Sequence, residues 1–157
     1  MDPLKDSSIL RLIDQFQLSP HPEGGWYREV IRSGLTVKRS DGHQRNAITG
    51  IIFLLGKDDK SCWHCVDGAD EIWIHLQGAP LSLWRLDPNS NELVRLKLDT
   101  AQPMQMIPAG FWQAACSQGS YTLVSCCVSP GFDFDDFKML RDIPKQCWPE
   151  EALRELI

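Results

Sequence analysis

The sequence predicts a mainly β domain, an antiparallel sandwich or barrel with one helix in front of it. Two observations carry this prediction. Short stretches rich in β-branched and aromatic residues follow one another over residues 26–131, and turn signals such as GKDDK, VDGAD and DPNSN separate them. Many short strands at this spacing are typical of sandwiches and barrels, and not of alternating β/α folds. A chain of 157 residues without repeats or linkers is expected to form one domain, residues 1–157.

The elements follow from periodicity and from turn residues. Apolar residues recur at helical spacing over residues 7–17, where Asp6 or Ser7 can cap a helix, and the prolines and glycines of LSPHPEGG then end it. Pro149, followed by two glutamates, predicts a short helix that runs through Leu156. Strands are expected at residues 26–33, 47–55, 61–66, 71–78, 81–87, 92–98, 104–110, 112–117 and 121–131.

Composition excludes some partners. The formal net charge of −5 argues against a phosphate-binding surface, and Lys38, Arg39 and Arg45 flank a polar loop where we expect them to be solvated. Nucleic acid is therefore not an expected partner. The N-terminus lacks the pattern of a signal peptide, and the longest apolar run, AITGIIFLLG, is too short for a membrane span. We expect a cytoplasmic protein without a membrane partner, whose six cysteines are reduced thiols.

The stretch SCWHCVDGADEIWIHLQG, residues 61–78, raises the question of a redox or zinc site. Cys62 and Cys65 have CxxC spacing, but they lie in a predicted strand, where residues three apart face opposite sides and are ~10 Å apart. A disulfide needs Cα atoms within ~7 Å. A structural zinc site needs four ligands, and no second CxxC or HxxxH is present. We expect all six cysteines to be ordinary core or surface residues.

A different spacing in this stretch is informative. His64, Glu71 and Gly78, followed by Pro108, Gly110 and Gln113 in PAGFWQ, resemble the two motifs of the cupin superfamily. The segments HPEGGWYRE, DEIW, HLQGAPL, IPAGFWQAA and SPGFDFDDF resemble one cupin family of unknown function, whose members are often labelled as sugar-nucleotide epimerase-like. The resemblance covers roughly residues 8–150 and implies a double-stranded β-helix, a jelly-roll barrel, with an N-terminal helix and short C-terminal helices. It also implies a homodimer.

The resemblance bears on metal binding as well. Metal-binding cupins generally use three histidines and one glutamate, but here Val66 and Gln113 stand at two of the histidine positions. A glutamine offers only a neutral amide oxygen, and His75 lies ~13 Å along the strand from Glu71, too far to share an ion with it. We therefore expect no tightly bound metal. His64, Glu71 and Gln113 remain weak candidates for a loosely held divalent ion.

Three functions are compatible with this pattern. The first is a cupin that binds a small carbohydrate-like or anionic molecule in its barrel, with isomerase or epimerase activity as one option; the second is a metabolite-binding module without catalysis. The third, a metal-dependent enzyme, is disfavoured by the residues at the two histidine positions.

The site residues follow from the same pattern. The expected catalytic residues are His64 and Glu71. Trp73 shares the strand face of Glu71, and Arg28 can hold an anionic group through its planar guanidinium. The expected substrate-binding residues are Gln113, Trp73, Arg28, Tyr27 and His75.

Overall fold

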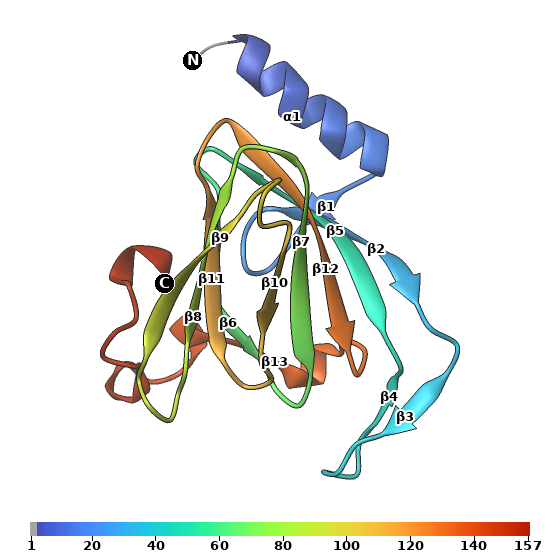
Figure 1. The fold of residues 1–157 in the computed structure, drawn as a ribbon, viewed down its shortest axis with the longest axis vertical. Coiled ribbons are helices and arrows are strands. Elements are labelled where there is room, and N and C mark those ends of the chain that lie inside the picture. The colour runs from blue at the N-terminus through green and yellow to red at the C-terminus, as the bar shows by residue number, and fades with distance from the viewer. Residues whose placement is uncertain (1–2) are drawn as a thin grey trace.

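The computed structural model describes residues 3–157, with side chains from residue 8 onward. Two antiparallel sheets face each other and form a barrel, with one helix at its end (Figure 1). The helix and the first strands are α1 (Pro3–Phe16), β1 (Ser19–Pro20), β2 (Trp26–Arg32), β3 (Thr36–Lys38), β4 (Gln44–Asn46), β5 (Thr49–Gly56) and β6 (Lys60–Val66). The remaining strands are β7 (Asp70–Gly78), β8 (Leu81–Leu86), β9 (Leu93–Leu98), β10 (Met104–Ile107), β11 (Trp112–Ser117), β12 (Tyr121–Ser129) and β13 (Phe137–Met139).

The two sheets divide the strands in a jelly-roll manner. The six-stranded sheet has the order β1-β2-β5-β12-β7-β10, and the five-stranded sheet has the order β13-β6-β11-β8-β9. Strands β3 and β4 form a separate hairpin that projects from the barrel beyond β2 (Figure 1). The predicted mainly β fold is thus confirmed. No helix among the described residues is both long and apolar enough to cross a membrane.

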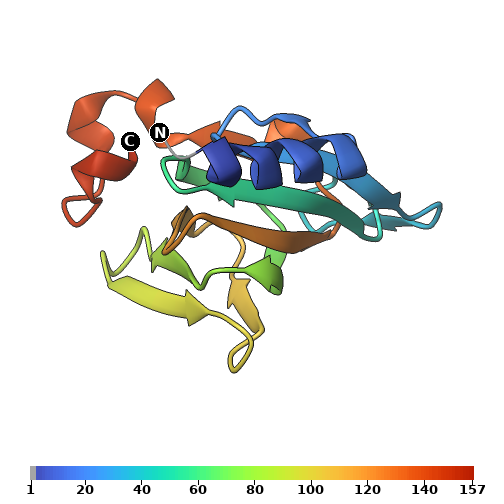
Figure 2. The ribbon, with the colours of Figure 1, turned by 90° about the horizontal axis from the view of Figure 1, so that it is seen from above.

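Strand β5 explains why AITGIIFLLG reads as a continuous apolar run. Phe53 and Leu55 point into the core between the sheets, where they meet Trp73 of β7. Leu54 points to the outer face and packs against the apolar side of α1, which lies over β5 (Figure 2). A strand that is covered on both faces carries apolar residues at successive positions instead of alternating ones.

The outer face of the five-stranded sheet is covered by the C-terminal segment. Trp63 of β6 is fully buried there, and its indole nitrogen donates a hydrogen bond to the Leu153 carbonyl, 3.0 Å away. Cys65 is buried on the same face. Between them, His64 points the other way, into the barrel, as strand alternation requires. Cys62 and Cys65 are both free thiols, as predicted.

Several boundaries differ from the prediction. Helix α1 begins at Pro3, so neither Asp6 nor Ser7 is its cap. The predicted terminal helix from Pro149 is wrong, because only Arg154–Leu156 form a helical turn there, of the 3-10 type. The sequence does not predict the hairpin β3–β4. Its strands are three residues long and exposed or half-buried, so they are too short to show an alternation of apolar and polar residues. The other C-terminal helices are also single 3-10 turns, at Phe134–Asp136, Leu140–Asp142 and Lys145–Cys147.

The expectation that Arg39 and Arg45 are solvated is also wrong. Only 8% of the Arg39 side chain and 10% of the Arg45 side chain are exposed, because both guanidinium groups bind the carboxylate of Asp136. Asp136 lies 97 positions from Arg39 and 91 positions from Arg45 along the chain, which is why a local pattern could not reveal the contact.

Candidate functional site

A cavity of about 430 Å³ opens at one end of the barrel. Such a volume lies within the range of about 300–1,000 Å³ that is usual for small-molecule sites. The apolar core around Phe53, Trp73 and Leu83 fills the other part of the barrel. The lining of the cavity includes two histidines, two buried glutamates and an aromatic wall. The histidines and buried glutamates are His21, Glu23, His64 and Glu71, and the aromatic residues are Tyr27, Phe132, Phe134 and Phe137.

His64 and Glu71 reach the cavity from adjoining strands. His64 lies on β6 and Glu71 lies at the start of β7, and the short turn after Val66 joins the two strands. Both side chains line the cavity and are almost completely buried. The structure thus brings the two expected catalytic residues together, while their catalytic role stays a prediction.

Glu23 is a third buried titratable group in the cavity. It lies in the loop HPEGG, which packs against β6 through a hydrogen bond of 2.8 Å from the Cys62 N–H to the Glu23 carbonyl. Gly24 has φ of +109°, and a Cβ atom there would collide with the Lys60 carbonyl oxygen. Glycine is therefore required for the loop to approach the strand and insert Glu23 beside His64.

The hydrogen bonds of His64 determine where its proton lies. Nδ1 is 2.8 Å from the Cys62 carbonyl oxygen, which can only accept, so Nδ1 carries the hydrogen. Nε2 is 3.2 Å from Oε2 of Glu23. In a neutral imidazole Nε2 is then the acceptor, and Glu23 must be the protonated partner that donates to it. The Ser61 hydroxyl donates to the other oxygen of Glu23, 2.8 Å away.

Burial determines the charge states in this cluster. Loss of solvation raises the pKa of Glu23 to about 8, against a smaller lowering by the Ser61 hydrogen bond. The same loss of solvation lowers the pKa of His64, which the charge of Glu71 opposes. Both shifts favour a neutral Glu23–His64 pair that shares one proton over an ion pair.

Glu71 is held by Gln113, whose orientation is fixed by Trp73. The indole N–H of Trp73 can only donate, and it donates to Oε1 of Gln113 at 2.8 Å. The amide nitrogen of Gln113 must then face Glu71, and it donates to Oε2 at 2.6 Å. Burial raises the pKa of Glu71 to about 7, with opposition from His64 and from the Gln113 hydrogen bond.

His21 completes the cluster. Its Nδ1 accepts from the Glu23 backbone N–H at 3.2 Å. Burial, and then the charge of His64, lower its pKa to about 3, so the ring is neutral. Neither His21 nor Glu23 is among the site residues expected from the sequence. The one signal for either is their position in HPEGG, because the contact of Glu23 with Ser61 on β6 joins residues 38 positions apart.

The expected substrate-binding residues lie at different depths. Tyr27 and Arg28 line the cavity, Arg28 at its exposed rim with a hydrogen bond of 3.3 Å to the Phe16 carbonyl. Gln113 and Trp73 are fully buried behind Glu71 and do not line the cavity, and their part in binding a ligand stays a prediction. His75 lies farther along β7, where its Nε2 is 3.2 Å from the Ala79 carbonyl. It takes no part in the cavity.

The weak metal candidates do not form a metal-binding set. The one atom of Gln113 that could ligate an ion is its Oε1, and this atom already accepts from Trp73. The amide instead presents an N–H group to Glu71. Among the described residues, no cluster of three or more His, Cys, Asp and Glu side chains is arranged to hold an ion. The residues at the two cupin motifs therefore do not fit the usual cupin metal.

Comparison with known structures identifies relatives of uncharacterised function. A hypothetical protein from Leishmania major is 33% identical, with a TM-score of 0.75 over 80% of this chain and 83% of that chain. A protein from Shewanella oneidensis is also 33% identical, with a TM-score of 0.73 over 82% of each chain. Oxalate decarboxylase from Bacillus subtilis shares the fold alone, at 14% identity and a TM-score of 0.58 over 81% of this chain and 32% of that chain.

No curated protein matches the sequence. Residues 10–140 match the family described as the Cupin superfamily (DUF985), which covers both motif regions and most of the barrel. The jelly-roll topology and the two relatives at 33% identity agree with this match. The chain therefore belongs to the DUF985 family of the cupin superfamily.

Proposed function

We propose that the protein binds a carbohydrate-like small molecule in the cavity and transfers a proton on it, as an isomerase or epimerase does. The observation that carries the proposal is the arrangement of the cluster: the buried carboxyls of Glu23 and Glu71 line one cavity, and the buried imidazole of His64 lies 3.2 Å from Glu23. Burial raises the pKa of both carboxyls towards neutral pH, which suits the roles of base and acid.

The proton transfers follow from these states. Epimerisation removes a proton next to a carbonyl group and returns a proton to the opposite face, which requires a base and an acid. Glu71 accepts a hydrogen bond from the Gln113 N–H, which favours its ionised form, so Glu71 takes the role of the base. Glu23 retains its proton and is the acid that donates this proton to the ligand; His64 Nε2 is the hydrogen-bond acceptor that positions it. Gln113 holds Glu71 in place by its hydrogen bond.

The walls of the cavity support a ring-bearing ligand. Arg28 lies at the rim, and none of the ion pairs among the described residues involves it. Its guanidinium can hold a carboxylate or phosphate of the ligand. Tyr27, Phe132, Phe134 and Phe137 offer aromatic surfaces, which commonly pack against sugar rings and other rings.

One observation favours a binding module without catalysis as the second candidate. Among the described residues, every fully buried side-chain nitrogen or oxygen has a hydrogen-bond partner within the protein. The hydrogen-bonding groups of His21, Glu23, His64 and Glu71, the acid–base cluster, therefore have partners without a ligand, as those of a purely structural polar network would. Turnover distinguishes the two candidates, because a binding module would bind the ligand and leave it unchanged.

The test uses proton exchange with solvent. The protein is incubated in D₂O with a panel of sugars, sugar phosphates and sugar nucleotides, and ¹H NMR follows the loss of carbon-bound protons. We expect exchange on at least one compound, and its loss in Glu71→Gln and in His64→Ala. Glu92→Gln, on an exposed glutamate outside the cavity, is the control and should retain exchange. Binding without exchange in the unsubstituted protein would support the binding module, and unfolding of His64→Ala would assign this histidine a structural role.

A further inference from the structure

The segment from Gly131 to Phe137 has two different faces. Its side chains Phe132, Phe134 and Phe137 form one wall of the cavity and pack on one another at ring-centroid distances of 4.9–5.9 Å. Phe137 also lies 5.5 Å from the ring of His64 and 5.9 Å from that of His21. The two imidazoles of the acid–base cluster are therefore kept from water in part by this segment.

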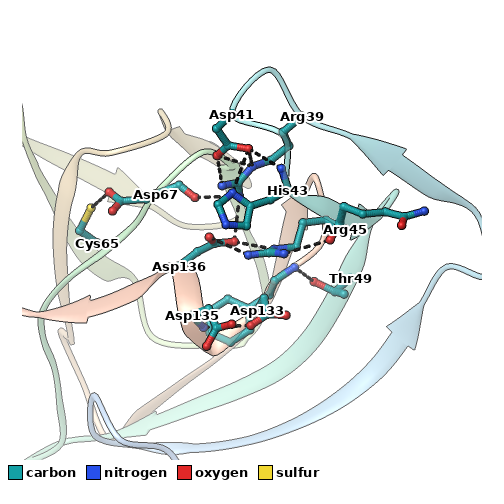
Figure 3. Close-up of polar contacts among 12 residues, drawn as sticks. Arg39, Asp41, His43, Arg45, Thr49, Cys65, Asp67, Asp133, Asp135 and Asp136 are labelled. Carbon is teal, nitrogen blue, oxygen red and sulfur yellow. Dashed lines mark hydrogen bonds and ion pairs between the residues drawn. The ribbon is translucent and has the colours of Figure 1, made fainter.

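The other face of the segment is attached by polar contacts. The Phe132 N–H donates to the Thr49 hydroxyl at 2.9 Å, and Arg32 donates to the Phe132 carbonyl at 3.2 Å. The Asp136 carboxylate accepts from Arg39 at 2.8 Å and from two nitrogens of Arg45 at 2.8 and 3.0 Å (Figure 3). Both arginines belong to the β3–β4 hairpin region, which lies outside the barrel (Figure 1).

This ion cluster holds the segment from Gly131 to Phe137 in one position. Asp41 also binds Arg39, so two arginines and two aspartates balance in charge. Burial would raise the pKa of Asp136, but the hydrogen bonds from Arg45 and Arg39 outweigh this effect and lower it. Buried ion pairs contribute little net stability compared with apolar packing, whereas loss of one partner is costly. Such a cluster therefore specifies one arrangement of the segment more than it stabilises the fold as a whole.

We propose that Arg39 and Arg45 are positioning residues of the cavity: through Asp136 they hold the aromatic segment over His21 and His64 and keep water from both imidazoles. The inference rests on the proposed function and deepens it. Imidazoles that are shielded from water stay neutral, and the proposed acid–base cluster of His21, Glu23, His64 and Glu71 depends on this. The hairpin, outside the barrel, thereby sets the chemistry inside it. The titratable groups that face His21 are Tyr27, Glu23 and His64, and the proposal leaves all three in place.

The test compares Arg45→Gln with the matched control Arg95→Gln. Two nitrogens of Arg95 likewise donate hydrogen bonds, in this case to the Ser82 hydroxyl oxygen. Arg95 lies over Trp84 on the five-stranded sheet, away from the cavity segment. Amide hydrogen exchange measured by NMR reports how firmly the segment is held in place. The pH titration of the His21 ring signals reports how far this ring is exposed to water. Neither measurement needs a ligand, so a failure here is separate from a failure of the proposed function.

In Arg45→Gln we expect the amides of residues 132–137 to exchange at least roughly tenfold faster, while those of β5 and β12 are unchanged. The His21 signals should not titrate above about pH 5 in the unsubstituted protein and should titrate towards the ordinary histidine range in the variant. Arg95→Gln should change neither. If Arg45→Gln does not fold, Arg45→Lys, which keeps the charge but loses the fork, is measured by the same criteria. A folded variant in which either the exchange or the His21 titration stays as in the unsubstituted protein overturns the proposal.

Discussion

Replacing Glu23 by glutamine should make the protein more stable at alkaline pH. Glutamine reproduces the hydrogen bonds of the protonated acid, because its N–H can donate to His64 and its oxygen can accept from Ser61. It cannot ionise. The substitution thus removes the cost of ionising a carboxyl that the fold keeps out of water, while the packing of the loop stays nearly the same.

The sign and size of the effect follow from the pKa of Glu23. Burial raises this pKa from 4.5 to about 8. A group whose pKa is raised on folding stabilises the fold fully below its unfolded pKa, and this contribution is lost as the pH rises through the folded pKa. At about 1.4 kcal/mol per pKa unit, the loss amounts to about 3–5 kcal/mol. It occurs between about pH 4.5 and pH 8.

The assay is urea unfolding at several pH values from about 5 to 9. The difference in unfolding free energy, Glu23→Gln minus the unsubstituted protein, should grow by about 3–5 kcal/mol across this range. Glu92→Gln, on an exposed side chain, is the control for the loss of one carboxyl group. Parallel pH profiles of Glu23→Gln and the unsubstituted protein would refute the reasoning, because they would mean that Glu23 is ionised or solvated in the folded state.

Three further predictions concern the thiols, the core and the assembly. Alkylation followed by mass spectrometry of native protein should find Cys62 and Cys65 unbonded to each other, and a stable 62–65 disulfide would contradict the strand geometry. Trp73→Ala should lower the unfolding free energy by about 3–5 kcal/mol in urea, because it leaves a large cavity in the core; a loss below about 1 kcal/mol would show that the core rearranges. Light scattering at micromolar concentration should find a homodimer that covers exposed apolar residues such as Ile31 and Leu35, and a monomer alone would count against this.

The strands were predictable because their signals are local. Alternation and turn residues placed nearly all of the long strands within a few residues of their observed bounds, from β2 (Trp26–Arg32) to β12 (Tyr121–Ser129). The inward direction of His64 and Glu71 has the same origin, because it follows from strand alternation on either side of a short turn.

What the sequence could not show depends on contacts between distant segments. Glu23 reaches His64 only because the HPEGG loop packs against β6, and Arg45 is buried only because Asp136 meets it from 91 positions away. Trp73 does share the inward face of Glu71, as alternation predicts. It nevertheless lies behind Gln113, because the depth of a side chain in a barrel depends on what fills the barrel above it.

The acid–base cluster destabilises the fold, and this bears on its role. Loss of solvation raises the pKa of both Glu23 and Glu71, although each carboxyl would be fully ionised and hydrated in water at neutral pH. The apolar core around Trp73 and the covered outer faces of both sheets must offset that cost. Well-packed apolar residues of similar size at these positions would be expected to give a more stable barrel. Polar groups that lower stability in a cavity are expected where a fold serves binding or catalysis, and the cluster therefore supports the proposed function.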